Sequence, residues 1–197
     1  NFSYQRNLGI RRENVYINAG VLLIDLKKWR AADCQVRFCD AIKKFNGFLE
    51  FPDNDVICRE FQDEISLLPL KYNMITPFLM CNYREILSLR KPHKVMSETE
   101  YNEARNKPVI VHFTTCFLMK GRPWMYECNH PYAKLWYEIY NKTLWKEEPL
   151  KVLNGNKIVI YKIISMLPRR FIIQFFGLIH AYVKPFLQRK QTELCRR

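Results

Sequence analysis

The chain has 197 residues, of which 48% are apolar and 14% aromatic, so it suits one globular domain with an appendage, and a disordered or fibrous chain is excluded. The net charge is +13, and residues 150–197 contribute 10 basic and one acidic residue, a net +9. A basic terminal segment favours a polyanionic partner, either nucleic acid or an anionic membrane.

The cysteines indicate a reducing compartment. There are seven of them, an odd number, and none forms a CxxC pair. They stand among apolar neighbours, as Cys39 and Cys58 do, which predicts reduced, mostly buried thiols and argues against zinc. We therefore expect a cytosolic protein. The chain begins at Asn1 without a signal segment, so we expect it to be an internal piece of a longer protein.

Residues 16–29 (YINAGVLLIDLKKW) predict a strand that is buried on both faces. The centre of this segment, 21–24, is apolar, rich in β-branched residues and too short for a helix. Asn18, Ala19 and Gly20 precede it, and such small residues let a ligand approach the backbone, while the Asn amide offers a donor and an acceptor. The alternative is a glycine bend in which Asn18 satisfies its own turn.

The following segments alternate between helix and strand. The expected elements are an amphipathic helix within 31–49, a turn into a short helix at 51–57, a strand at 67–72, a helix from the capping box at 97–100 towards residue 105, a buried strand at 109–113 and an aromatic-faced helix within 130–147. This alternation predicts an α/β layered domain over residues 1–150. Ligands in such domains bind at strand ends, so we expect Asn18 and His112 to share a site.

Two carboxylates flank an amide at Asp53, Asn54 and Asp55. A structural interpretation makes Asp53 the N-cap of a helix and puts Asp55 in its first turn, where the helix dipole favours both. A functional interpretation is a polar cluster that faces a sugar or a metal ion, since oxygen ligands suit Mg²⁺ or Mn²⁺.

His112 stands in an otherwise apolar strand. It could be a hydrogen-bonded core residue, but a neutral imidazole at a strand end is also a good metal ligand. The loop that follows carries two threonines, Lys120, Arg122 and Trp124. Arg and Lys pair with phosphate oxygens, so this loop suits a metal-bound diphosphate. The alternative is a solvated basic loop that is anchored by a buried Trp.

Five segments occur together in one order: YINAGVLLIDLKKW, FPDNDVIC, LPLKYN, VIVHFTT and KGRPW. Over about residues 14–140 the sequence thereby resembles glycosyltransferase family 8, a set of retaining enzymes with the GT-A fold that use nucleotide-sugar donors. The resemblance implies a mixed sheet flanked by helices, here as a partial domain with a C-terminal helical extension.

The resemblance implies a role for each residue that faces the donor sugar. Asn18, Ala19 and Gly20 would line the sugar pocket, and Asp53 would bond hydroxyls of the transferred sugar. Asn54 falls where the family usually has a Gln near the anomeric carbon, which makes Asp53 and Asn54 the candidate catalytic residues. Asn is one methylene shorter than Gln, enough to move its amide from a tuned position.

The resemblance also implies a diphosphate site with a metal ion. His112 would coordinate Mn²⁺ or Mg²⁺, which would act as a Lewis acid on the leaving UDP. Arg122 falls where the family commonly has a diphosphate-binding Lys, and Lys120 lies on the same loop. The DxD motif that supplies the main metal ligands of the family should stand upstream of Asn18 and does not occur there. We therefore expect residues 1–197 alone to be inactive.

The segment 151–197 predicts a basic amphipathic helical tail. Its apolar runs, 158–167 and 171–187, are each shorter than the about 20 residues that span a bilayer as a helix. Apolar residues bracketed by cations favour a helix in the membrane interface, so we expect 156–190 to bind anionic lipid. The alternative is a helical hairpin packed on the domain. Nucleic acid is not expected, because the aromatics alternate with Ile and Leu rather than with Lys and Arg.

The expected function is a metal-dependent, retaining hexosyltransferase. It would move glucose or galactose from a UDP-sugar to a glycan or glycolipid in surface polysaccharide or lipopolysaccharide synthesis, as a peripheral protein at the cytoplasmic face of the membrane. One alternative is a non-catalytic membrane-peripheral protein or truncated remnant, in which Asp53 and His112 are structural. Another is a metal-dependent phosphate hydrolase, in which these two residues converge on a water.

Overall fold

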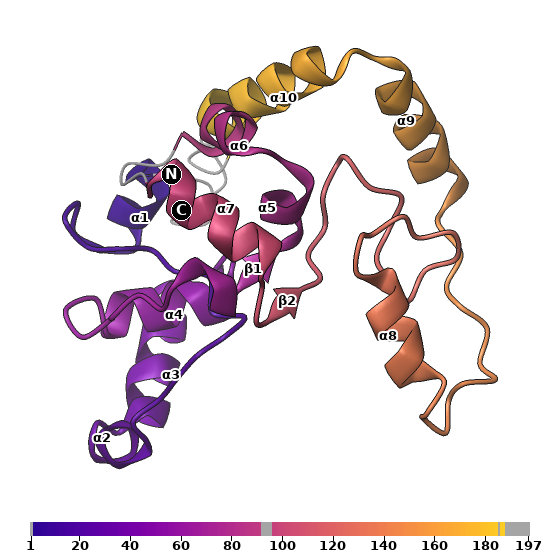
Figure 1. Cartoon of the computed structure of the whole chain (residues 1–197). Helices are drawn as coiled ribbons and strands as arrows, with labels where there is room; N and C mark the ends of the chain where they lie inside the picture. Colours follow the sequence, from indigo (N-terminus) through magenta and orange to yellow (C-terminus); the bar gives the residue numbers. More distant parts are fainter. Residues whose placement is uncertain (1, 92–95, 185, 188–197) are drawn as a thin grey trace. The chain divides into compact units, whose positions relative to one another are not determined.

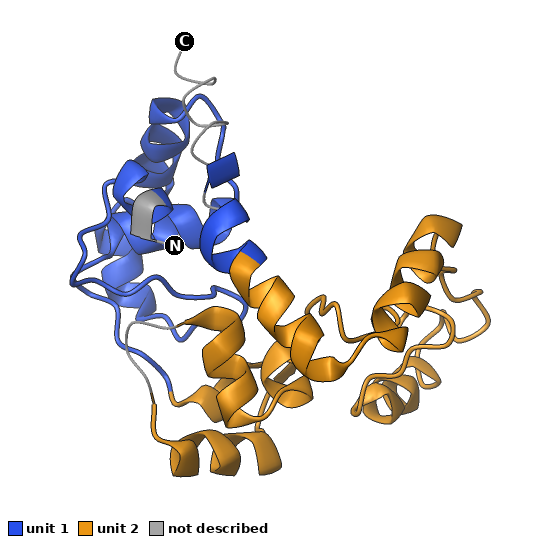
Figure 2. Ribbon diagram, turned by 90° about the horizontal axis from the view of Figure 1, so that it is seen from above, with its two compact units in different colours: residues 1–68, 179–197 blue, residues 69–178 orange. Residues whose placement is uncertain are grey.

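The computed structural model describes residues 2–91, 96–184, 186 and 187. The chain forms two compact units, which Figure 2 shows in blue and orange: unit 1 comprises residues 1–68 and 179–197, and unit 2 comprises residues 69–178. Each unit has its own apolar core. The predicted division into a domain, 1–150, and a tail, 151–197, stays a prediction.

Unit 1 is helical in its described residues. Its elements are α1 (Phe2–Asn7), α2 (Leu26–Ala31), α3 (Cys34–Lys44), α4 (Pro52–Glu60) and a short π-helical segment, η2 (Ile179–Val183) (Figure 1). The core gathers around Leu8, Ile10 and Cys58. The predicted helix within 31–49 is α3, and the predicted turn into a helix at 51–57 opens α4.

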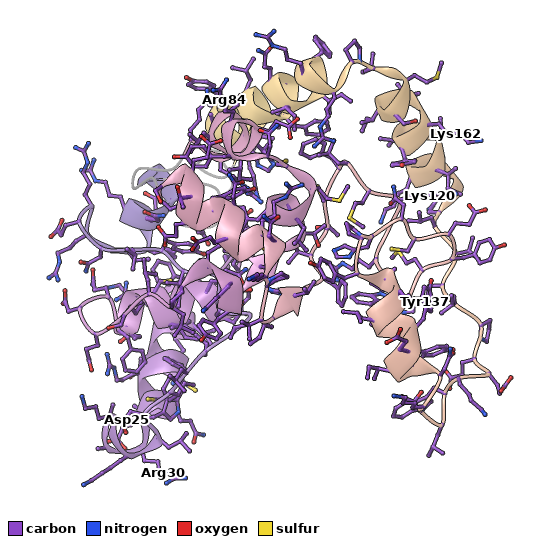
Figure 3. The ribbon with its side chains drawn as sticks, in the orientation of Figure 1. Asp25, Arg30, Arg84, Lys120, Tyr137 and Lys162 are labelled. Carbon is purple, nitrogen blue, oxygen red and sulfur yellow. The ribbon has the colours of Figure 1, made fainter. Side chains whose placement is uncertain are left out.

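The predicted strand at 21–24 is wrong. Residues 21–25 have no regular structure, Leu23 is 86% exposed, and Asp25 caps α2 by accepting hydrogen bonds from the N–H groups of Lys27 and Lys28. Figure 3 labels Asp25 and Arg30 at this helix. A strand buried on both faces needs neighbouring strands to pair its backbone, and the described part of unit 1 contains none.

Unit 2 carries a small parallel sheet among helices. Its elements are η1 (Leu70–Tyr72), β1 (Met74–Ile75), α5 (Thr76–Met80), α6 (Tyr83–Arg90), α7 (Glu98–Asn106), β2 (Val111–His112), α8 (Ala133–Tyr140), α9 (Gly155–Met166) and α10 (Arg169–Leu178) (Figure 1). Strands β1 and β2 pair in parallel, with Met74 opposite Val111 and Ile75 opposite His112.

The predictions for this region are confirmed in part. Ser97 caps α7 through its side chain, as predicted, and the strand at 109–113 is present only at residues 111 and 112, as β2. The strand expected at 67–72 is wrong, because residues 70–72 form the 3₁₀ turn η1 after Pro69. The alternation of helix and strand thus produces helices around a two-stranded parallel sheet.

Helix α10 packs on α6 in the core of unit 2. Gly177 makes this close approach possible, since a Cβ at this position would lie 2.6 Å from the carbonyl oxygen of Ser88. The Arg169 guanidinium adds a two-pronged ion pair with the Glu85 carboxylate, at 2.7 and 2.9 Å. The first half of the segment 171–187 is therefore packed on the unit, as the hairpin alternative predicts.

Helix α9 differs from α10, because none of the residues of α9 is buried. Its exposed apolar side chains include Val159, Ile163 and Met166, which is 84% exposed. Figure 3 shows Lys162 projecting from this helix. Among the described residues, no helix is long and apolar enough to cross a membrane. Residues 188–190 of the predicted lipid-binding segment lie outside the described part of the chain.

Candidate functional site

The candidate site residues belong to both units. Asn18, Ala19, Gly20, Asp53 and Asn54 lie in unit 1, whereas the three candidates for the diphosphate and the metal, at 112, 120 and 122, lie in unit 2. The prediction that Asn18 and His112 share a site stays a prediction.

Within unit 1, the structure joins Asn54 to the segment 18–20. Asn54 lies in the first turn of α4, and its Oδ1 accepts a hydrogen bond from the Ala19 N–H at 2.6 Å. Asn18 Oδ1 accepts a hydrogen bond from the Gly20 N–H at 3.1 Å, the local turn that the structural alternative describes. The sugar-facing candidates at 18–20 and at 54 thus form one cluster.

The two carboxylates around Asn54 have opposite environments. Asp55 is 1% exposed, and it accepts hydrogen bonds from the hydroxyls of Tyr4 and Tyr16 and, at 3.0 Å, from the Phe51 N–H. Burial, and then the bond to Asp55, raise the pKa of both tyrosines well above the usual range. Asp55 is therefore a core residue of unit 1.

Asp53, in contrast, is exposed on the same turn. The alternative that makes Asp53 the N-cap is wrong, because the N-cap of α4 is Phe51, which precedes Pro52 and makes no side-chain cap. An exposed carboxylate beside Asn54 is placed to meet a sugar hydroxyl, the role implied for it, which stays a prediction.

In unit 2, Asn73 orients His112. Asn73 directly precedes β1, and its Oδ1 lies 2.9 Å from Nδ1 of His112 on β2. An amide oxygen only accepts, so His112 Nδ1 carries the proton and Nε2 keeps its lone pair. A histidine held in this way by a neighbouring amide or carbonyl is typical of a metal ligand. Sequence reasoning gave Asn73 no role, although it ends the segment LPLKYN.

Arg122 acts on His112 electrostatically. Burial, and then the nearby Arg122 cation, lower the pKa of His112 below its ordinary value, which favours the neutral imidazole that a metal needs. The Arg122 guanidinium lies over the Trp124 ring, 5.2 Å from its centroid. The Arg122 cation therefore acts on His112, and the diphosphate site implied for the two residues stays a prediction.

Lys120 has a different environment from Arg122. The ammonium group of Lys120 pairs with the carboxylate of Glu127 within the same loop. The backbone N–H of Lys120 donates to Asn129 Oδ1 at 2.8 Å. Because Glu127 neutralises Lys120, Arg122 is the stronger candidate for binding an anion at this loop.

A second histidine, His130, contacts residues that flank the loop after β2. His130 is 5% exposed; its Nδ1 accepts from the Tyr132 N–H at 3.0 Å, and its Nε2 lies 3.4 Å from Thr76 Oγ1. The same Thr76 oxygen accepts from the Thr114 N–H at 3.0 Å. Burial lowers the pKa of His130 to about 4. Sequence reasoning missed this residue, which a buried-histidine interpretation of Asn-His-Pro at 129–131 could have found.

A comparison against known families agrees with the five segments. The family model described as "Glycosyl transferase family 8" matches residues 3–128, a range that contains all five segments. The chain belongs to glycosyltransferase family 8. This membership confirms the resemblance and implies a GT-A-like nucleotide-sugar transferase fold.

Curated relatives of this family 8 chain are distant and longer. It is 26% identical over 141 residues to General stress protein A of Bacillus subtilis (71% of this chain, 46% of that protein). It is 27% identical over 139 residues to Lipopolysaccharide 1,2-glucosyltransferase of Escherichia coli (69% and 37%), and 25% identical over 178 residues to Lipopolysaccharide glucosyltransferase WaaO of Escherichia coli K12 (87% and 43%). The chain thus spans less than half the length of these relatives. No solved structure matches it.

A metal ion is expected in a family 8 enzyme, and the described residues fit it only in part. His112 presents one neutral nitrogen. No group of three His, Cys, Asp or Glu side chains gathers within residues 2–91, 96–184, 186 and 187. Mn²⁺ and Mg²⁺ take mostly oxygen ligands, so this set does not make a complete site for either ion.

Proposed function

We propose that this family 8 chain carries donor-binding residues of a retaining hexosyltransferase with the GT-A fold. It would take glucose or galactose from a UDP-sugar and transfer it to a glycan or glycolipid acceptor of lipopolysaccharide or another surface polysaccharide. The family match supports the reaction class, and the names of two relatives, both lipopolysaccharide glucosyltransferases, favour the acceptor.

The single observation that carries the proposal in the structure is the orientation of His112 by Asn73 Oδ1, which leaves Nε2 available, with the Arg122 cation near enough to lower the pKa of His112. A guanidinium can bind two oxygens of a phosphate group in a forked geometry, and the neutral imidazole of His112 offers a nitrogen to Mn²⁺ or Mg²⁺. In unit 1, Asp53 would bond a sugar hydroxyl. Arg122 would hold the diphosphate while the glycosidic bond breaks, because its charge offsets the negative charge that develops on UDP.

A sugar-transfer assay tests this proposal. UDP-glucose and UDP-galactose would be offered with lipopolysaccharide core acceptors, and the wild type compared with Arg122→Ala and Lys120→Ala. We expect Arg122→Ala to lower kcat/KM about 100-fold, and Lys120→Ala much less, since Lys120 is already paired with Glu127. Cleavage of simple phosphate esters without sugar transfer would instead support a hydrolase.

We further propose that the protein is peripheral at the cytoplasmic face of the membrane and binds anionic lipid through α9 and the segment after it. Val159, Ile160 and Ile163 of α9 are each more than half exposed. Residues 149–187 contain no acidic residue, so an anionic surface would meet only cations here. A glycolipid acceptor would lie in the same surface.

Vesicle flotation tests the membrane proposal. The full chain is mixed with vesicles that contain or lack an anionic phospholipid, and we expect it to float only with the anionic ones. The double variant Val159→Asp, Ile163→Asp should lose most of this binding. Leu144→Asp is the matched control, because Leu144 is 96% exposed but stands outside the segment. Equal losses in both variants would show that α9 is not the binding surface.

A further inference from the structure

Asn54 and Cys58 stand one helical turn apart on α4 and accept hydrogen bonds from two N–H groups of the segment 17–19. Asn54 Oδ1 accepts from the Ala19 N–H at 2.6 Å, and Cys58 Sγ accepts from the Ile17 N–H at 3.2 Å. One face of α4 thereby supplies the hydrogen-bond acceptors of this segment.

We propose that Asn54 is a positioning residue that holds the backbone of Ala19, and thus the segment 18–20, in place against α4. Its oxygen is committed to the Ala19 N–H and does not act at the anomeric carbon of the donor, the position implied for the corresponding Gln of the family. Only the effect on sugar transfer rests on the proposed function; the hydrogen bond itself does not.

The surroundings of Ala19 explain why it needs this partner. Residues 21–25 form no strand, so a sheet does not fix the backbone that leads into them. Ala19 is half-buried between the exposed residues Asn18 and Gly20, and an N–H group in such a place costs free energy when it is left unpaired. A side chain from α4 supplies the acceptor that a neighbouring strand would otherwise provide.

The residue type at position 54 fits this task. At 2.6 Å, the oxygen of Asn54 already lies at the short end of the range for an N–H···O bond. A Gln would carry its amide one methylene further and would have to displace Ala19 or turn away from it. An Asp keeps an oxygen at the same place, but it replaces the NH₂ group with a second oxygen and adds a negative charge.

Hydrogen exchange in the ¹⁵N-labelled chain tests the bond directly. We expect the Ala19 amide to exchange about tenfold faster in Asn54→Ala than in the wild type, and Asn54→Asp to restore most of the protection. The amide of Tyr101, bonded to Ser97 within unit 2, is the internal control for folding. Unchanged Ala19 exchange in Asn54→Ala, with Tyr101 also unchanged, would overturn the proposal. If Asn54→Ala does not fold, the comparison of Asn54→Asp with Asn54→Gln decides it.

The kinetics of sugar transfer distinguish positioning from chemistry at the reacting carbon. Positioning predicts that Asn54→Asp retains more transfer than Asn54→Gln, and that Asn54→Ala raises KM more than it lowers kcat. A role at the anomeric carbon predicts the reverse order, with the family residue Gln active, and would overturn the proposal. If the wild type transfers no sugar while Ala19 remains protected through Asn54, the proposed function fails and the positioning role stands.

Discussion

Asn73 Oδ1 accepts a hydrogen bond from His112 Nδ1 at 2.9 Å, beside the parallel pairing of β1 and β2. His130 is held in the opposite way, since its Nδ1 accepts from the Tyr132 N–H. We therefore predict that the two neutral histidines are opposite tautomers, His112 with the proton on Nδ1 and His130 with the proton on Nε2. Long-range ¹⁵N–¹H NMR at neutral pH measures both in one sample.

The variant Asn73→Ala extends this prediction. Removing the acceptor should abolish the preference of His112 for the Nδ1 proton and leave His130 unchanged, so His130 is the internal control. Observing His112 with its proton on Nε2 in the wild type would contradict the assignment, and with it the availability of Nε2 for a metal ion.

We predict that unit 2 loses stability in mild acid because of His130. Its pKa is lowered from 6.5 to about 4 by burial, so between these values the unfolded chain binds more protons than the folded one. The free energy of unfolding should fall as the pH falls from about 6.5 to about 4, by at most about 1.4 kcal/mol per pH unit from this residue.

Urea unfolding at several pH values measures this slope. The variant His130→Gln should be less stable than the wild type at pH 7. Its free energy of unfolding should depend less on pH, because Gln at position 130 does not titrate. An identical pH dependence in both proteins would show that His130 is not the source.

We predict that replacing the two carboxylates of Asp53-Asn54-Asp55 has very different effects on the stability of unit 1. Asp55→Ala should destabilise unit 1 by about 3 kcal/mol, because it leaves the buried hydroxyls of Tyr4 and Tyr16 without their acceptor. Asp53→Ala should change stability by less than about 0.5 kcal/mol, since Asp53 is exposed. Chemical denaturation compares the two, and equal effects would contradict the assignment of Asp55 to the core.

Two glycines form a matched pair for the packing of α10 on α6. Gly177→Ala should destabilise unit 2 by about 1–3 kcal/mol, because the new methyl would meet the Ser88 carbonyl oxygen. Gly155→Ala in α9 should be neutral or stabilising by up to about 1 kcal/mol, since nothing lies within 4 Å of the added carbon. Thermal unfolding measures both, and a stable Gly177→Ala protein would show that α10 can move off α6.

Local features that depend on a few adjacent residues were predictable from the sequence. The cap at Ser97 and the helix after Phe51 depend on a few neighbours, and the structure confirms both. The influence of Arg122 on His112 was also predictable, since the two residues are only ten positions apart. The hydrogen bond of Asn73 to His112 was not, because parallel strands bring together residues that are 39 positions apart.

The strand predicted at 21–24 failed for a different reason. An apolar run records what a segment is suited to bury, but burial depends on what lies next to it. Leu22, Leu23 and Ile24 are exposed in the described structure, and the backbone that leads to them is held by Asn54 instead of a neighbouring strand. The composition of this run therefore did not predict its local structure.

The exposed run 21–24 also has a consequence for handling the protein. A short, apolar, uncharged stretch of backbone without ladder partners is a template on which other copies can add in register and aggregate. Asp25, Lys27 and Lys28 follow it directly and act as gatekeepers, because stacking copies would bring their like charges together. Precipitation of this chain should therefore grow with added salt, which screens that repulsion.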